Sequence, residues 1–343
     1  MKKKLTNMFV FLIILSLIFT LSGCSASNSS NSNKEPSSSQ SQNQATNYPT
    51  KPIQVYVGYA AGGATDIATR MMAPYLEKQL GQPIVVINKP GSGAEIAYVA
   101  TAKANSDGYT LGVINSPTVL AIPLSRKAQY KLSDFAIIGN LAFDENVIII
   151  KPNGKYKDLE DLVQKAKENP DTITMGVAGL YADDHLAGLA LQQAAGVKFR
   201  YPVFQGGAQL SAAVMGGQID AALCNGADVM SIVQEGKLVV AATMGNEENP
   251  NLPGAPTLKS KGYDIVMGSY RALVVPANTP PEILDKLRAA LKKAAEDPDY
   301  IAKNEKTKQP ILYLSPEDFS KVLKTDEEKL GKLWKTLGLP SKK

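Results

Sequence analysis

The chain has 343 residues, of which 44% are hydrophobic and 20% are charged. This length suggests about two domains of roughly 150 residues each, and the composition excludes a disordered or fibrous class for the chain as a whole. One histidine and two cysteines leave too few residues for histidine-based zinc sites or a disulfide scaffold. Setting aside the three N-terminal lysines lowers the net charge from +5 to +2, which does not indicate a nucleic-acid-binding protein.

The N-terminus has the pattern of a bacterial lipoprotein signal. Lysines at positions 2–4 precede an apolar run over residues 8–19, which is too short for a membrane span. Small residues then lead to Cys24, as in signals that are cleaved just before a lipidated cysteine. We therefore expect a signal peptide over residues 1–23 and a lipid anchor at Cys24. The alternative is an ordinary signal anchor in which Cys24 is incidental.

Residues 25–48 are almost entirely Ser, Asn and Gln with a few others. Such a stretch buries too little apolar surface to offset the entropy of ordering it, so a flexible tether is expected over residues 24–50. No later segment reaches about 18 consecutive apolar residues. The sequence thus predicts a body held by its lipid anchor at the outer face of the cytoplasmic membrane.

Beyond the tether, short β-branched runs alternate with longer runs of helical period. The strands are expected at residues 53–57, 84–87, 110–114, 173–177, 219–223 and 238–243. The helices are expected at residues 66–80, 95–103, 159–168, 184–195, 209–215 and 229–235. Strands separated by helices predict mainly parallel sheets with covered faces, which is the α/β class.

Two apolar runs have no place in this alternation, residues 146–150 and residues 272–275, and proline follows each closely. We interpret them as strands that cross between two lobes, with ordinary edge strands as the alternative. The first lobe would then contain residues 51–145 and 271–343, and the second residues 146–270. Such a topology suits a clamshell that closes by rotation about its two crossings.

Two loops with consecutive glycines each lead into a helix. The first spans residues 58–66, and the second spans residues 204–208 after a strand-like run. Backbone N–H groups at a helix N-terminus favour an anion, so each loop could hold one end of a ligand between the lobes. Thr65 or Asp66 could equally be a simple N-cap. The first loop lacks the glycine motifs of dinucleotide and nucleoside-triphosphate sites.

Short motifs along residues 52 to about 339 together resemble the substrate-binding receptors of tripartite tricarboxylate transporters. They are KPI at 51–53, GGATD at 62–66, LGQPIVV at 80–86, NKPG at 88–91, DGYTL at 107–111, GGA at 206–208, GGQID at 216–220, LP at 252–253 and PANTPP at 276–281. The resemblance implies a two-lobed clamshell of the periplasmic-binding-protein type with no cofactor and no catalytic role. It implies capture of a small carboxylate-bearing metabolite and its delivery to integral-membrane transporter subunits.

The resemblance also implies site residues. In this family, backbone N–H groups and ordered waters at the first loop hold the ligand's carboxylates, and the second loop faces them. The match carries these roles to Gly62, Gly63, Ala64, Thr65 and Asp66, and to Gly206, Gly207 and Ala208, with Tyr59 and Gln205 in the same loops. Ser116 falls where the family usually has a small hydroxyl residue near the cleft.

The chain departs from the family pattern in the loop over residues 178–184, where hydroxyls are mostly lost and Asp183 and Asp184 appear. These carboxylates could receive an ammonium group, or could merely cap the following helix. Arg271 could grip a carboxylate in a bidentate fork, or pair with Asp183 or Asp184. The expected ligand is therefore an amino acid or similar zwitterion, with a plain carboxylate as the alternative.

A surface-anchored α/β hydrolase is the main competing interpretation. Ser92 lacks the first glycine of G-x-S-x-G, and His185 in the first turn of an expected helix is typical of a structural histidine. Cys224 ends an expected strand and indicates a small buried residue, while neighbouring Asn225 is a candidate for the cleft. These features favour a binding protein without catalytic or metal-binding residues.

Overall fold

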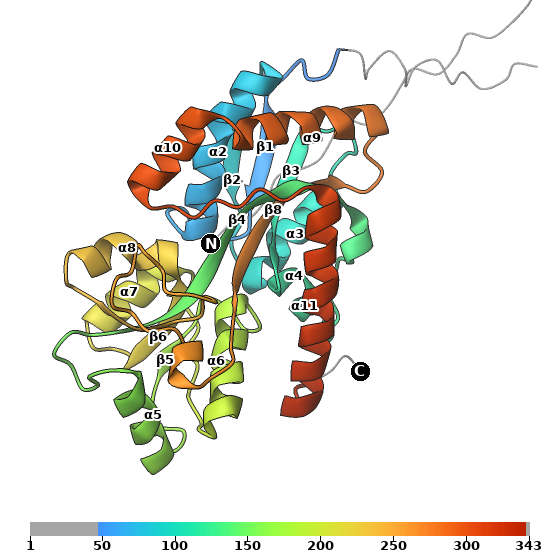
Figure 1. The fold of residues 1–343 in the computed structure, drawn as a ribbon. Coiled ribbons are helices and arrows are strands. Elements are labelled where there is room, and N and C mark those ends of the chain that lie inside the picture. Colours follow the sequence, from blue (N-terminus) through green and yellow to red (C-terminus); the bar gives the residue numbers. More distant parts are fainter. Residues whose placement is uncertain (1–46, 341–343) are drawn as a thin grey trace, which may run out of the picture. The chain divides into compact units, whose positions relative to one another are not determined.

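The computed structural model describes residues 47–340, so the expected signal peptide, Cys24 and nearly all of the expected tether lie outside it. Within these residues strands and helices alternate (Figure 1). The strands are β1 (Ile53–Val57), β2 (Ile84–Asn88), β3 (Thr110–Ser116), β4 (Phe135–Ile150), β5 (Met175–Gly176), β6 (Ala221–Asn225), β7 (Val239–Thr243) and β8 (Gly268–Pro276). The helices are α2 (Ala64–Leu80), α3 (Glu95–Ala102), α4 (Thr118–Ser125), α5 (Leu159–Glu168), α6 (Asp183–Ala195), α7 (Gly207–Met215), α8 (Gly226–Gln234), α9 (Pro281–Ala295), α10 (Pro298–Thr307) and α11 (Pro316–Leu337).

The first lobe is built on strands in the order β2, β1, β3, β8 and β4. β1 pairs in parallel with β2 and β3, as expected for strands joined by covering helices. β8, from the C-terminal part of the chain, lies antiparallel between β3 and β4. The two ends of the described chain therefore complete one sheet (Figure 1).

β4 belongs to the sheets of both lobes. Its residues 135–145 pair with β8, and its residues 146–150 pair with β6 and β7. β5 extends the second sheet in parallel with β6. Every antiparallel pair between the named strands involves β4 or β8, because these two run against the strands of the helix-connected units. The sheets are consequently mixed, with parallel pairing confined to the units that have connecting helices.

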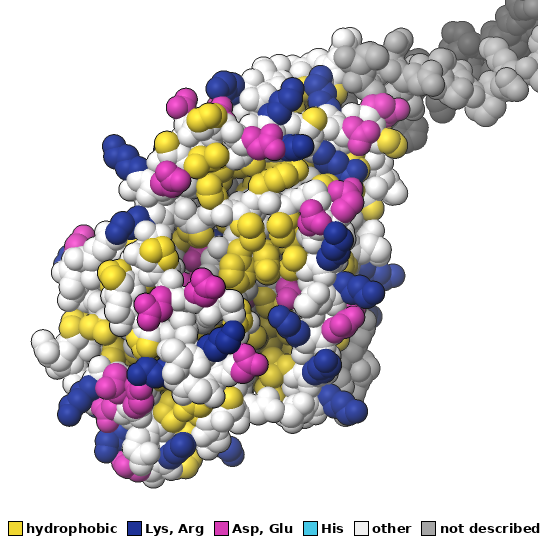
Figure 2. Space-filling view, viewed as in Figure 1, with side chains coloured by type: hydrophobic (Ala, Val, Ile, Leu, Met, Phe, Trp, Pro, Cys, Tyr) yellow, Lys and Arg dark blue, Asp and Glu magenta, His cyan; other side chains and the backbone are white. Residues whose placement is uncertain are grey.

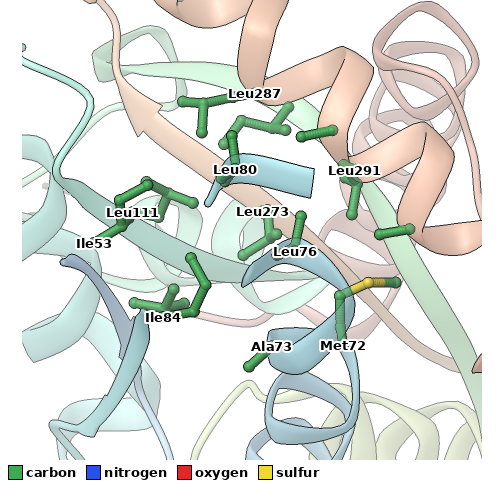
Figure 3. Close-up of a cluster of buried hydrophobic side chains, with 14 of the residues drawn as sticks. Ile53, Met72, Ala73, Leu76, Leu80, Ile84, Leu111, Leu273, Leu287 and Leu291 are labelled. Carbon is green, nitrogen blue, oxygen red and sulfur yellow. The ribbon is translucent and has the colours of Figure 1, made fainter. Parts of the chain in front are cut away.

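The core of the first lobe joins segments that are far apart in the sequence. α2 buries Leu76 and Leu80, which lie one helical turn apart, and α9 buries Leu287 and Leu291 with the same spacing. Figure 3 shows these leucines gathered around Leu273 of β8. Burial of one such side chain contributes about 1.5–3 kcal/mol, so this contact holds the C-terminal part of the chain on the first sheet.

Several expected boundaries shift in the structure. Residues 173–177 keep only two residues of strand, β5, and residues 199–203 form isolated bridges, of which one joins Val203 to Val177. α2 and α7 each begin two residues earlier than expected, because a glycine serves as the N-cap in both.

The folded body also begins before the end of the expected tether. Tyr48 is 2% exposed, its hydroxyl donates to the Gly108 carbonyl over 2.7 Å, and its ring meets that of Tyr109 edge-on. The N–H of Thr50 donates to the Tyr109 hydroxyl over 2.9 Å. The expected boundary at residue 50 is therefore too late, since a buried aromatic residue already fixes the chain at position 48.

Among residues 47–340, no helix combines the length and apolar character needed to cross a membrane. α11, a helix of 22 residues, buries Phe319, Leu323, Leu330 and Trp334 along one side and exposes charged residues on the other.

Candidate ligand-binding cleft

The first glycine loop leads from β1 into α2. Gly62 has a φ of +82°, in the left-handed region that suits glycine, and Gly63 is the N-cap. Thr65 and Asp66 lie in the first turn and do not cap the helix. Asp66 instead accepts a hydrogen bond from the N–H of Gly62 over 2.9 Å and forms an ion pair with Arg70. Asp66 thus braces the loop and does not face the cleft.

The second glycine loop leads into α7. Gly206 is the N-cap with a φ of +151°, and no side chain caps the helix. A Cβ added at Gly207 would lie 2.3 Å from Cγ of Asp228, so any other residue there must displace the Asp228 side chain. Among the described residues, the N–H groups of Gly207 and Ala208 have no hydrogen-bond partner. They are available to an anion.

The two loops converge on Asp228, which the sequence analysis did not single out. Asp228 lies in the first turn of α8, and its Oδ1 accepts a hydrogen bond from the N–H of Ala64 over 2.7 Å. Its side chain also packs against Gly207. Burial and the nearby carboxylate of Asp144 raise the pKa of Asp228 to about 7. A carboxylate of the protein itself therefore sits where the family resemblance placed a carboxylate of the ligand.

Asp183 is 5% exposed at the start of α6. Its Oδ2 accepts hydrogen bonds from Nδ2 of Asn146 over 2.8 Å and from Nδ2 of Asn225 over 2.9 Å. The N-cap of α6 is Ala182, and the Asp183 side chain accepts no hydrogen bond from the N–H groups of this helix. The alternative that Asp183 merely caps the helix is therefore wrong.

Asp184 lies beside it and does accept a hydrogen bond from the first turn of α6, as the capping alternative expects. Its carboxylate accepts hydrogen bonds from the N–H groups of Ala178 and His185, and it is 3% exposed. Burial, followed by the charge of Asp183, raises the pKa of Asp184 well above its usual range. The carboxyl groups at the start of α6 thus lie in a crowded and poorly solvated environment.

Arg271 is 1% exposed and lies behind the cleft in β8. Its Nη2 lies 2.8 Å from Oδ2 of Asp144 and 3.2 Å from Oδ1 of Asn225, and its Nε donates to the Thr65 hydroxyl over 3.3 Å. The expected pairing with Asp183 or Asp184 is wrong, because Asp144 takes the guanidinium instead. Nη1 has no hydrogen-bond partner among the described residues.

A cavity of about 30 Å³ lies among these groups. The expected site residues that border it are Tyr59, Gly63, Ala64, Thr65, Asp183, Asp184, Gly206, Gly207 and Asn225. Those that do not border it are Gly62, Asp66, Ser116, Gln205, Ala208 and Arg271. The lining residues that sequence reasoning missed are Ala60, Asn115, Ala178, Ala182, Cys224 and Asp228. Asp228 was open to detection, because like Asp183 it is an acid in a helix turn just beyond a strand.

A second cavity of about 320 Å³ shares Tyr59 and Ala178 with the first. Its other lining residues are Gly58, Pro90, Gly91, Ser92, Gly93, Ala94, Arg126, Gly179, Leu180, Val203, Phe204 and Gln205. Leu180 and Val203 are about half exposed, which is unusual for large apolar side chains in the described residues. The small acidic cavity thus adjoins a larger, more apolar space, which contains the expected residue Gln205.

Ser116 is directed away from both cavities. Its hydroxyl donates to Oδ2 of Asp326 in α11 over 2.6 Å. Asp326 borders a different cavity of about 450 Å³, together with Phe143, Tyr270 and Leu330. Figure 2 shows hydrophobic side chains in the hollow beside α11 on this face of the molecule. The family resemblance placed Ser116 near the ligand, but in the structure Ser116 borders neither of the two cavities at the glycine loops.

His185 is buried and contacts residues of the preceding loop and a neighbouring tyrosine. Its Nδ1 accepts a hydrogen bond from the N–H of Tyr181 over 2.9 Å, and its ring contacts those of Tyr181 and Tyr201. Burial lowers the pKa of His185 to about 4, so the ring is neutral near pH 7. Residues 47–340 contain no group of three or more His, Cys, Asp or Glu placed to hold a metal ion.

Comparison with known proteins identifies the family. Residues 68–339 match the model of the tripartite tricarboxylate transporter family receptor. A UPF0065 protein in the gbd 5′ region of Cupriavidus necator is 31% identical over 86% of this chain and 90% of its own length. A solved periplasmic transporter is 30% identical with a TM-score of 0.80, covering 85% of this chain and 99% of its own. The periplasmic binding protein BugD is 27% identical with a TM-score of 0.79, over 86% of this chain and all of its own. The chain therefore belongs to the tripartite tricarboxylate transporter receptors, a family of extracytoplasmic solute-binding proteins rather than enzymes.

Proposed function

We propose that this receptor binds a small solute that carries both a carboxylate and a positively charged group, such as an amino acid. The observation that carries this proposal is the charge balance of the cleft. Asp183, Asp184 and Asp228 all border the inner cavity, and none forms an ion pair with another described residue. The guanidinium behind them, Arg271, is already paired with Asp144. A positive group on the solute would supply the missing charge.

Two carboxylate oxygens are free to meet that group. Oδ1 of Asp183 and Oδ2 of Asp228 have no hydrogen-bond partner among the described residues, while the other oxygen of each is held by the protein. At an effective dielectric constant of about 20, an ammonium 4 Å from a carboxylate gains about 4 kcal/mol before desolvation. That energy is sufficient to separate a zwitterion from a plain anion.

The carboxylate of the solute has donors available at the helix N-termini. The N–H groups of Gly207 and Ala208 lack partners in the described residues, and the start of α2 also lines the cavity. Such groups, with the positive end of the helix dipole, stabilise a carboxylate without a counter-ion. The rest of the solute would extend into the cavity of about 320 Å³ beside Leu180 and Phe204.

A plain dicarboxylate is the second candidate, favoured by one specific observation. The pKa values of Asp184 and Asp228 are raised, mainly by burial. A protonated carboxyl group donates a hydrogen bond and no longer repels an anion. Such a solute would therefore bind better as the pH falls, whereas a zwitterion needs the aspartates ionised.

We further propose that the mature protein is anchored by a lipid at Cys24 and hands its solute to the membrane subunits of a tripartite tricarboxylate-type transporter. The support is the order of lysines, apolar run, small residues and Cys24, followed by a polar stretch. Lipoprotein cysteines with more than one acyl chain attach stably, which keeps the receptor near its transporter.

Titration calorimetry of the full chain in mild detergent tests the ligand class, with amino acids in one panel and di- and tricarboxylates in another. The double variant Asp183→Asn/Asp184→Asn should lose at least tenfold in affinity for an amino acid. Asp171→Asn is the matched control, because Asp171 is exposed and its side chain makes no hydrogen bond among the described residues. The zwitterion proposal is wrong if the parent prefers citrate-like ligands, or if the double variant binds amino acids as tightly as the parent does. The protein would then be a receptor for carboxylates in general.

A further inference from the structure

Asp228 links elements of the two lobes in the manner of a bound anion. It belongs to α8, beside the second sheet, yet its Oδ1 accepts the N–H of Ala64 at the start of α2, beside the first sheet, over 2.7 Å. Its carboxylate also lies against Gly207 at the start of α7. Both glycine loops of the cleft therefore surround one carboxylate of the protein.

No other side chain among the described residues accepts a hydrogen bond from the first N–H groups of α2. Its N-cap is Gly63, which has no side chain, and no side chain of the helix itself caps it. A helix N-terminus leaves N–H groups unpaired and carries a partial positive charge. Asp228 thus provides from another element the capping interaction that α2 lacks.

While Asp228 holds this position, the N–H of Ala64 is not available to a solute carboxylate, and the inner cavity beside it is small. Its volume of about 30 Å³ is enough for about two water molecules. Residues of the two loops and Asp228 are among those that line it. A solute that places its carboxylate on the N–H of Ala64 must therefore move Asp228 away.

We propose that Asp228 is an intramolecular competitor of the solute, which closes the cleft of the unliganded receptor and selects against plain anions. This inference rests on the proposed function, because it assigns a charge-selecting residue to the same cleft. A solute with a carboxylate alone must displace Asp228 and leave it uncompensated. A solute that also carries an ammonium group gives the displaced carboxylate a new partner.

The first variant that tests this is Asp228→Ser, whose side chain is too short to reach Ala64. Affinity for a dicarboxylate such as succinate should rise about ten- to a hundredfold, because a charge-assisted hydrogen bond no longer has to be broken. Affinity for the best amino acid should not rise in parallel. Small-angle X-ray scattering of the unliganded variant should show a larger radius of gyration than that of the parent, since the cleft has lost its internal link.

The second variant, Ala64→Pro, removes the other partner of the same hydrogen bond. Proline is well tolerated at the first position of a helix, and Gly63 already has the extended backbone, with φ −78° and ψ 163°, that precedes proline. Unliganded Ala64→Pro should open as Asp228→Ser does. Its affinity for succinate should fall, however, because the solute loses the same N–H. Asp171→Asn is again the control, and circular dichroism confirms that each variant is folded.

The outcomes separate this inference from the proposed function. Opening of both variants, with opposite effects on succinate affinity, supports the role of Asp228. If the radius of gyration of both variants equals that of the parent, the proposed role of Asp228 is wrong. It is also wrong if the parent binds its solute but Asp228→Ser binds succinate no better than the parent does. If no small carboxylate binds any form, the proposed ligand class fails, and the scattering comparison alone still decides whether Asp228 closes the cleft.

Discussion

Nη2 of Arg271 lies 2.8 Å from Oδ2 of Asp144, and both side chains are almost completely buried between the strands that join the two lobes. This pair shapes the charge of the cleft. Because Arg271 forms its ion pair with Asp144, it forms none with Asp183, Asp184 or Asp228, which line the cavity. The negative character of the site thus follows from a pairing behind it.

Removing the guanidinium alone should be severely destabilising. Arg271→Met leaves Asp144 buried without a cation, and the free energy of unfolding is expected to fall by about 3–5 kcal/mol. The double variant Arg271→Met/Asp144→Asn should recover most of that loss, because no uncompensated charge remains. Urea unfolding of the two variants and the parent measures the difference. Equal stability of the single and double variants would show that packing, and not charge, dominates at this position.

The raised pKa of Asp228 predicts a pH dependence of stability. With a pKa of about 7 in the folded protein and 3.8 as the usual value, Asp228 binds more protons when folded than when unfolded between about pH 4 and pH 7. Its contribution to stability is therefore full below pH 4 and is lost as the pH rises to 7, by at most about 4 kcal/mol.

Comparison of the parent with Asp228→Asn isolates this contribution. The charged groups that face Asp228 are Asp144 on β4, Arg271 on β8, and Asp183 and Asp184 on α6, and they remain in both proteins. Thermal unfolding between pH 4 and pH 8 should show a steeper decline for the parent than for the variant. Parallel curves would mean that Asp228 is ionised across the whole range.

The glycine of the second loop should be essential for binding. Gly207→Val places a Cβ 2.3 Å from Cγ of Asp228, so the side chain of Asp228 must move and a bulky group enters the cleft. Binding of any solute should be lost, with a smaller stability cost than that of a core substitution. Gly331→Ala is the control, because an added Cβ in α11 meets no atom within 4 Å. It should raise stability by about 0.5–1 kcal/mol and leave binding unchanged.

The lipid anchor has a direct test in cells. Cys24→Ala should release the protein from the membrane fraction without unfolding it, because it leaves every buried residue of the described body unchanged. Fractionation after a high-salt wash distinguishes the forms, and ligand-induced thermal stabilisation of the released protein shows that its cleft is intact. A variant that stays with the membrane would contradict the anchor.

The local pattern of the sequence was sufficient to predict helices α2, α3 and α5–α8 and the parallel strands, with shifted bounds, but α4 and α9–α11 were not predicted. Apolar period and glycine stops, as at Leu76, Leu80 and Gly81, identify α2 without any tertiary information. The antiparallel insertion of β8 between β3 and β4 was not predictable in this way, because its partners are chosen by contacts across the whole chain. For the same reason, the sequence did not predict that the single strand β4 pairs in both sheets.

The candidate site shows the same division. The acids at Asp183 and Asp184 were visible as a departure from the family's hydroxyls, and both border the cavity. The partner of Arg271 was not visible, since Asp144 lies 127 residues away in the sequence. The hydrogen bond from Ala64 to Asp228 spans 164 residues. Which carboxylate meets which donor is decided by the closure of the lobes.

The place of β8 has a consequence for how the protein is made. This strand ends at Pro276, yet it fills the gap between β3 and β4 in the first sheet. Until that segment has emerged, β3 has no neighbour on one side, and the N-terminal half of the chain has only an unfinished sheet. Such long-range pairing slows folding. A chain that cannot complete its fold early stays unfolded for longer. This suits a polypeptide that has to pass through an export channel before it folds.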